Sequence, residues 1–240
     1  MPSKDHFHSV VATLISTPAD MLSQIGAGGA PAPRPISGKV MLLDGKPRLL
    51  YVGAEFCPFC ASERWALVQA LSRFGSFSNL GLTTSASEDV HPDTPTLSFH
   101  GATYTSKHVS FEGVEVAGRE IEGDSYAPLD ALTADQQALF DRYDRPPYVA
   151  EAAAGSIPFQ LLAGKFVVSG SQVDAGLLEG RTHEEIAQAV ASGDGDLGSG
   201  IIGAANQLTA AICELTNGLP ASACANGTIA DLRDALRASA

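Results

Sequence analysis

The chain has 240 residues, 45% of them hydrophobic, which is enough to bury a core and excludes an intrinsically disordered protein. Its 27 Asp and Glu residues outnumber 15 Lys and Arg, for a formal net charge of -12, and such an acidic protein repels nucleic acid and anionic lipid. No stretch reaches the roughly 18–20 apolar residues that a membrane-spanning helix needs.

The first 35 residues predict a segment that precedes the main domain. Residues 6–25 have a loosely helical pattern that breaks near Pro18. Residues 26–35 are almost all Gly, Ala and Pro, a composition typical of a linker without regular structure. We therefore expect residues 1–35 to form a helical segment and linker, and residues 36–240 to form the domain.

A βαβ unit is predicted at the start of the domain. Residues 48–53 are a short apolar run that indicates a strand. The pattern becomes helical from Ala61, with apolar residues at positions 67, 70, 71 and 74 on one buried face. Residues 80–84 indicate a second strand. This order places Cys57 and Cys60 in the loop at the start of the helix.

Residues 88–150 are less regular, and we interpret them as an insertion in the domain. Within them, residues 96–104 and 109–116 alternate apolar and polar side chains and predict an antiparallel pair of strands. Thr133 and Gln136 have the spacing of a capping box, which predicts the start of a helix.

Beyond residue 150 the pattern predicts two strands followed by helices. Residues 159–163 and 165–169 indicate strands around a tight turn, and a capping box of Thr182 and Glu185 opens the next helix.

The chain then predicts a C-terminal helical extension over residues 199–240. A Gly/Asp-rich link over residues 192–200 leads to a long amphipathic helix over residues 201–215, and Thr228 is the predicted cap of a short final helix.

The motif Cys57-Pro58-Phe59-Cys60 is the most informative feature of the sequence. Two cysteines at this spacing can close a small disulfide ring with little backbone movement. Free N–H groups and the helix dipole stabilise a thiolate at the first position, and the thiolate is the nucleophile of disulfide exchange. We therefore predict that Cys57 is the catalytic nucleophile and that Cys60 is the resolving thiol.

Three other interpretations of this cysteine pair stay open. In the first, the pair is half of a zinc site that is completed either by Cys213 and Cys224 or by a histidine. In the second, Cys57 and Cys60 are two buried core thiols, and in the third they form a permanent structural disulfide. A preceding strand and a following amphipathic helix favour the redox interpretation.

The segment from Tyr51 to Cys60, followed by a helix, resembles the thioredoxin superfamily, and so does Ile157-Pro158 ahead of two strands. The resemblance implies a thioredoxin-like α/β fold, a mixed central sheet flanked by helices, with a long insertion before the cis-proline strand and extra C-terminal helices. It further implies a cis bond before Pro158 that faces the dithiol. The substrate-binding residues it implies are Pro58, Phe59, Ile157 and Pro158.

Residues 45–47, 53–65 and 71–75, with Cys213 and Cys224, are most similar to domain-of-unknown-function family 929, thioredoxin-like proteins that often have a membrane anchor near the N terminus. The chain departs from ordinary thioredoxins at Tyr51, where those proteins carry a buried carboxylate. Phe59 stands where strongly oxidising relatives have a histidine. Glu55, the carboxylate nearest in sequence, is the candidate for proton transfer.

Cys213 and Cys224 flank an Asn-Gly-Leu-Pro stretch that stops a helix and turns the chain. This turn lets the two cysteines meet, so we predict a structural disulfide; two unpaired buried thiols are the alternative. A structural disulfide implies an oxidising compartment. We therefore expect an extracytoplasmic protein whose membrane anchor lies outside this sequence.

These observations predict a thiol–disulfide oxidoreductase, or a redox partner, that acts on protein thiols and disulfides through Cys57 and Cys60. A membrane redox partner is expected, and no cofactor, metal or nucleic acid. The alternatives are a non-catalytic thioredoxin-like interaction domain with a structural Cys57–Cys60 bond and a zinc-stabilised module.

Overall fold

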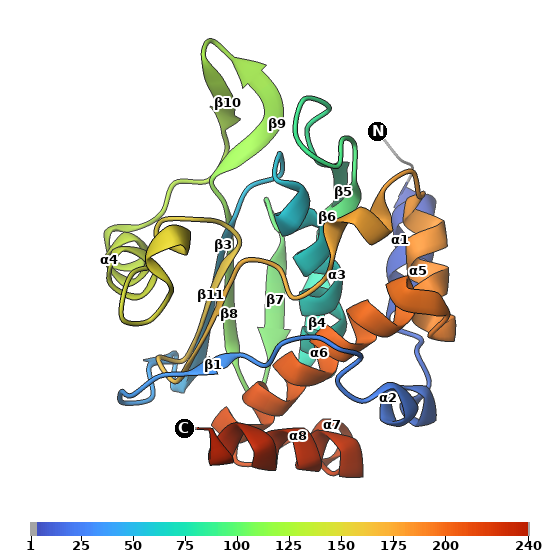
Figure 1. The fold of residues 1–240 in the computed structure, drawn as a ribbon, viewed down its shortest axis with the longest axis vertical. Coiled ribbons are helices and arrows are strands. Elements are labelled where there is room, and N and C mark those ends of the chain that lie inside the picture. The colour runs from blue at the N-terminus through green and yellow to red at the C-terminus, as the bar shows by residue number, and fades with distance from the viewer. Residues whose placement is uncertain (1–3, 240) are drawn as a thin grey trace.

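A mixed sheet of six strands runs through the centre of the protein (Figure 1). The structure is a computed structural model that describes residues 4–239. The strand order is β1-β12-β11-β3-β2, and β8 pairs with β3 as the parallel strand of an otherwise antiparallel sheet. Helices cover both faces, which confirms the predicted thioredoxin-like α/β arrangement. The strands are β1 (Arg34–Pro35), β2 (Leu42–Leu43), β3 (Lys46–Gly53), β8 (Ser110–Glu115), β11 (Phe159–Leu162) and β12 (Phe166–Ser169).

One face of the sheet is covered by α3 (Pro58–Leu71) and α6 (Gly195–Leu215). The sequence pattern predicts one buried face for α3, but almost every residue of this helix is buried. The reason is that α6 packs along the side of α3 that would otherwise face solvent. The helix that carries the dithiol is therefore held on all sides, and even Glu63 and Arg64 lie in the interior.

The other face of the sheet packs against α4 (Ala134–Tyr143) and the short helix η1 (Glu151–Ala153). Leu50 and Val52 of β3 and Phe159 of β11 form a second core there, and the Phe140 ring meets the Phe159 ring edge-on. Successive residues of a strand point to opposite faces, which is why Tyr51 belongs to the α3 side.

Two predicted strand pairings are wrong. β5 (Gly81–Thr84) does not complete a βαβ unit but pairs antiparallel with β6 (Pro95–Ser98). Residues 96–104 and 109–116 do not pair with each other, because β7 (Thr103–Ser106) pairs with β4 (Gly75–Ser78) and β8 pairs with β3. Alternating side chains identify a strand but not its partner. The parallel neighbour of β3 thus comes from inside the predicted insertion.

The hairpin of β9 (Ala117–Glu122) and β10 (Ser125–Pro128) projects beyond the end of the central sheet (Figure 1). The loop between β5 and β6 projects at the same end, which is also the end at which α3 begins. The dithiol therefore lies at the end of the molecule that carries both projections.

The second half of the domain follows the predicted order. β11 and β12 form the expected hairpin, and both predicted capping boxes are formed, at the starts of α4 and α5 (His183–Ser192). The short helix η2 (Ala175–Leu178) lies between β12 and α5.

The boundaries of the last helices differ from the prediction. α6 begins at Gly195, so most of the predicted link over residues 192–200 is helical. Short α7 (Ala221–Cys224) precedes α8 (Gly227–Ala238). The cap of α8 is Asn226, whose side chain accepts a hydrogen bond from the Thr228 backbone N–H, and not Thr228 itself.

The N-terminal segment, with α1 (Lys4–Leu14) and α2 (Ala19–Ile25), packs against the domain. The Asn206 side chain on α6 donates hydrogen bonds to the carbonyl groups of Leu22 and Gly26, and Gln207 donates to that of Ala30. Gly203 permits this approach, because a Cβ atom there would lie 2.1 Å from the Ala27 oxygen. Within residues 4–239, no helix combines the length and hydropathy required to cross a membrane.

Candidate active site

Cys57 is the N-cap residue of α3, and its sulfur accepts a hydrogen bond from the Cys60 backbone N–H at 3.3 Å. Pro58 fills the first helical position, where no N–H donor is needed. Hydrogen bonding from the Cys60 thiol lowers the pKa of Cys57, and the Cys60 N–H and the Arg64 charge add to this against the opposing effect of burial. The thiolate of Cys57 is thus favoured by its local surroundings.

Cys60, one helical turn further on, has a different environment. Its side chain is fully buried, and that burial raises the pKa of Cys60 well above its ordinary value, with a further contribution from Cys57. The two thiols of one motif therefore have pKa values shifted in opposite directions.

The Ile157–Pro158 peptide bond is cis, as predicted, and lies next to the dithiol. The Cys57 thiol and the Ile157 carbonyl oxygen are 3.9 Å apart, the geometry of a weak hydrogen bond to sulfur. Pro158 is buried at the start of β11, and its carbonyl accepts a hydrogen bond from the Gly170 N–H at 2.9 Å. The structure thus brings the cysteine pair, Cys57 and Cys60, next to Ile157 and Pro158, although Cys57 and Ile157 are 100 residues apart in the chain.

A buried ion pair behind the dithiol was missed by sequence reasoning. Arg64 donates two hydrogen bonds to the Glu115 carboxylate, both at 2.8 Å, and one to the Ala54 carbonyl. Burial acts to lower the pKa of Arg64, but Glu115, Tyr51 and Cys60 together outweigh burial and raise it. The only signal in the sequence was a charged pair, Glu63-Arg64, within an otherwise apolar helix.

Tyr51 lies on β3, six positions before Cys57. Its side chain is fully buried, and burial raises the pKa of the phenol well above 10.0. Its ring meets Phe99 edge-on at 5.1 Å, and the ring closely approaches Gly53, where an added Cβ would lie 2.2 Å from the hydroxyl oxygen.

Glu63, on α3 three residues after Cys60, is the second buried carboxylate near the dithiol after Glu115 on β8. Gln160 Nε2 donates to it at 2.6 Å, the Gln172 backbone N–H at 2.7 Å and the Ser171 hydroxyl at 3.3 Å. Burial raises the pKa of Glu63 to about 7 despite these donors. It ties the dithiol helix to β11, the strand that follows Pro158.

The other predicted residues differ in their exposure. Phe59 is 43% exposed beside Cys57, and Pro58 is buried. Glu55 is half-buried and accepts a hydrogen bond from the Ser98 hydroxyl at 2.5 Å. Its role in proton transfer stays a prediction.

Cys213 and Cys224 are joined by a disulfide that links α6 to α7, as predicted. This bond occupies the two cysteines of one version of the zinc interpretation; the other version completes the site with a histidine. In the part of the chain that the structure describes, no group of three or more His, Cys, Asp and Glu side chains is arranged to hold a metal ion.

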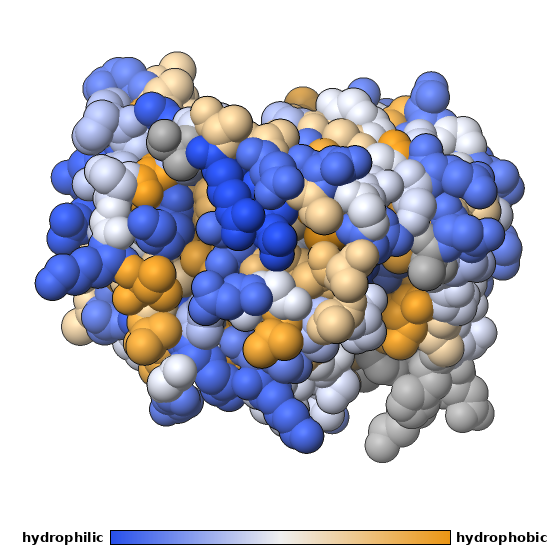
Figure 2. Space-filling view, turned by 90° about the horizontal axis from the view of Figure 1, so that it is seen from below, coloured by the Kyte–Doolittle hydropathy of each residue, from blue (hydrophilic) through white to orange (hydrophobic). Residues whose placement is uncertain are grey.

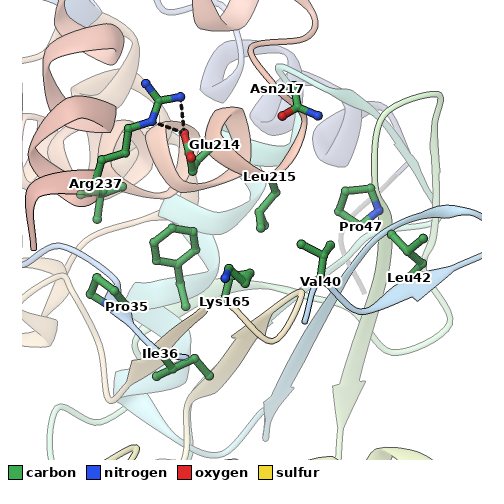
Figure 3. Close-up of a pocket in the computed structure, with 12 residues that line it drawn as sticks. Pro35, Ile36, Val40, Leu42, Pro47, Lys165, Glu214, Leu215, Asn217 and Arg237 are labelled. Atoms are coloured by element: carbon green, nitrogen blue, oxygen red, sulfur yellow. Dashed lines mark hydrogen bonds and ion pairs between the residues drawn. The ribbon is translucent and has the colours of Figure 1, made fainter. Parts of the chain in front are cut away.

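A separate hollow of about 610 Å³ lies at the opposite end of the molecule, between the sheet edge and α8 (Figure 3). Ile36, Val40 and Leu215 lie around it, and an ion pair between Glu214 and Arg237 forms part of its rim. Seen from the side of α8, the apolar side chains form separate patches among hydrophilic ones (Figure 2). This hollow takes no part in the dithiol site.

Comparison with known proteins gives one match. The family described as Domain of unknown function (DUF929) matches residues 34–214, a span that includes the dithiol, the cis-proline strand and Cys213. No curated protein matches the chain, and no solved structure does. Since the match covers most of the sequence, the chain belongs to the DUF929 family.

Proposed function

We propose that this protein is a thiol–disulfide oxidoreductase, or a redox partner, that acts on protein thiols and disulfides through Cys57 and Cys60. The observation that carries the proposal is the asymmetry of the two thiols. Both thiols are buried, but Cys57 keeps 6% of its surface exposed, caps a helix and has a lowered pKa, whereas Cys60 is fully buried and has a raised pKa. A permanent structural disulfide has no need of such a difference, but a nucleophile and a resolving thiol do.

The exchange proceeds in two steps. The Cys57 thiolate attacks one sulfur of a client disulfide, a Cys57–client bond forms, and the second client sulfur leaves as a thiolate that takes up a proton. Cys60 then loses its proton and attacks the Cys57 sulfur. The Cys57–Cys60 disulfide forms, the first client sulfur leaves, and the client has gained the two electrons that the dithiol lost. The reverse sequence oxidises a client.

The surroundings of Cys57 support binding of an extended client segment. The Ile157 carbonyl lies beside the Cys57 sulfur just before β11, and Phe59 of the same motif presents an exposed ring. Main-chain contacts at Ile157 would orient the client, and Phe59 would contact its side chains.

The location of the protein is part of the proposal. The Cys213–Cys224 disulfide supports an extracytoplasmic protein, because disulfides persist in oxidising compartments. In that setting a membrane anchor and a membrane redox partner that recycles the dithiol are the expected companions.

The reduction potential of the Cys57–Cys60 couple tests the function. Equilibration with glutathione buffers should give a potential within the range of about −270 to −120 mV spanned by disulfide oxidoreductases. The oxidised protein should also accept electrons from a small dithiol, and the reduced protein should cleave hydroxyethyl disulfide. A Cys57–Cys60 bond that stays closed throughout this range would favour the interaction-domain alternative, and stoichiometric zinc in the purified protein would favour the zinc module.

A further inference from the structure

Two segments stand over the dithiol and form what we term the mouth: residues 85–94, in the β5–β6 loop, and residues 117–128, the β9–β10 hairpin. Each contacts one of the two phenylalanines next to the cysteines. Tyr126 of the hairpin stacks on Phe56 with ring centroids 4.0 Å apart and planes 7° from parallel. His91 of the loop meets Phe59 edge-on at 6.2 Å.

The mouth is fixed to the dithiol loop by backbone hydrogen bonds. The Glu55 N–H donates to the Ala117 carbonyl at 2.8 Å, and the Ala86 N–H donates to the Phe56 carbonyl at 2.9 Å. Arg119 joins the two segments, since it pairs with Asp93 at 3.0 Å and also bonds Thr84. A client that reaches Cys57 therefore meets both segments.

The mouth is strongly acidic. Its two segments carry six carboxylates and one Arg or Lys residue, a net charge of -5, and Arg119 is already paired with Asp93. Burial raises the pKa of the Tyr126 phenol, and so do the negative charges of Asp89, Glu88 and Cys57. The six carboxylates are Glu88, Asp89, Asp93, Glu120, Glu122 and Asp124.

Exposed apolar side chains accompany these charges. Phe59 is 43% exposed, Val90 on the loop 57% and Ile121 on the hairpin 58%. Large apolar side chains at such exposure are typical of contact surfaces. The mouth and the dithiol motif thus combine exposed apolar side chains with a net negative charge.

We propose that the mouth selects clients whose reactive cysteine lies in an extended segment with basic and apolar neighbours. The inference rests on the proposed function and specifies its substrate class. Lys and Arg side chains complement the carboxylates, while apolar residues beside the cysteine contact Phe59, Val90 and Ile121. Acidic clients are disfavoured by like-charge repulsion, which suppresses encounter as well as binding.

Two peptides, each cyclised by one disulfide with a Phe beside one cysteine, test this inference; they differ only in carrying Lys or Glu at the flanking positions. Reduced protein should cleave the Lys peptide at least about tenfold faster at low salt, the size of a steering effect. The ratio of the two cleavage rates should fall toward one at about 0.5 M NaCl, because charges separated by more than a few Å are screened at that salt concentration. Acid quenching and mass spectrometry give both rates.

A pair of matched variants assigns the effect to the mouth. Glu88→Gln with Glu122→Gln should lower the Lys/Glu rate ratio several-fold, whereas Asp231→Asn with Asp234→Asn on distant α8 changes the net charge equally and should leave the ratio unchanged. Equal rates for the two peptides would overturn the inference, and so would an equal loss in both variants. If wild type still cleaves neutral hydroxyethyl disulfide, the proposed function survives that result; if it does not, the proposed function itself fails.

Discussion

Arg64 and Glu115 form an ion pair at 2.8 Å in which both side chains are fully inaccessible to solvent. Glu115 is the last residue of β8, the parallel neighbour of β3, and Arg64 lies one helical turn beyond Cys60. The pair therefore fixes the dithiol helix to the sheet, and it holds a positive charge close enough to lower the pKa of Cys57.

Removal of one member of this pair should destabilise the protein strongly. Arg64→Met is expected to lower the free energy of unfolding by about 3–5 kcal/mol, because it leaves Glu115 buried without its cation. Arg64→Met combined with Glu115→Gln should recover part of that loss, since the second change removes the unpaired charge. Urea unfolding measures both, and a double variant no more stable than the single one would contradict the prediction. The double variant should also show a raised pKa of Cys57 in the pH profile of alkylation.

Substitution of the two thiols should have unequal effects on mixed disulfides. Cys60→Ser leaves the nucleophile but removes the group that resolves the Cys57–client bond, so linked clients should accumulate. Cys57→Ser leaves only Cys60 of the motif. Because Cys60 is fully buried and has a raised pKa, few mixed disulfides with clients should form. Non-reducing electrophoresis of extracts with each variant shows the difference, and equal trapping would contradict the assigned roles.

Glu63 should give folding stability a specific pH dependence. Burial raises its pKa from 4.5 to about 7, so the folded protein binds this proton more tightly than the unfolded chain. The resulting stabilisation is present below about pH 4.5 and is lost as the pH rises to about 7, a change on the order of 3 kcal/mol.

Glu63→Gln should remove this decline and be the more stable protein above pH 7. The introduced amide can be accommodated, because among the described residues the Gln160 side-chain oxygen has no hydrogen-bond partner and can accept from it after a flip. Chemical denaturation from pH 4.5 to 8 gives the two profiles, with Asp231→Asn as the control that should retain the wild-type slope. A variant with the same slope as wild type would show that Glu63 does not titrate in this range.

The Cys213–Cys224 disulfide should stabilise the fold without taking part in exchange. It closes a loop of 11 residues, so replacing both cysteines by Ala should cost about 3 kcal/mol of unfolding free energy. The lowered pKa of Cys57 makes it a good leaving group, so mild reductant should open Cys57–Cys60 first. Mass spectrometry after brief reduction and alkylation distinguishes the two pairs; equal labelling of all four cysteines would contradict this order.

The parts of the fold that were predicted correctly depend on residues close together in the chain. The capping boxes at Thr133 and Thr182 satisfy helix N–H groups three positions away, and the turn after β11 joins adjacent strands. The reactive pair belongs to this class, since Cys57 and Cys60 are neighbours on one helical turn.

The parts that were missed depend on distant partners. Arg64 and Glu115 are 51 residues apart, and nothing in the sequence around either residue indicates that the two form a buried ion pair. The same holds for β8. Its alternating residues predict a strand, but they are equally compatible with parallel pairing to β3 and with antiparallel pairing to the preceding strand. Electrostatic surroundings such as those of Glu63 follow from the assembled core and have no local signature.

The close crossing of the N-terminal segment over α6 has a consequence for how the chain matures. A Cβ added at Gly28 would lie 2.2 Å from the Ser199 oxygen, and β1 pairs with β12. α1 packs against α5 and α2 packs against α6, so most partners of the N-terminal segment lie more than 150 residues later in the chain. During synthesis the segment lacks these partners until α5 and α6 have emerged. Once they pack against it, a stretch rich in Gly and Pro is held in place and should resist proteases despite its composition.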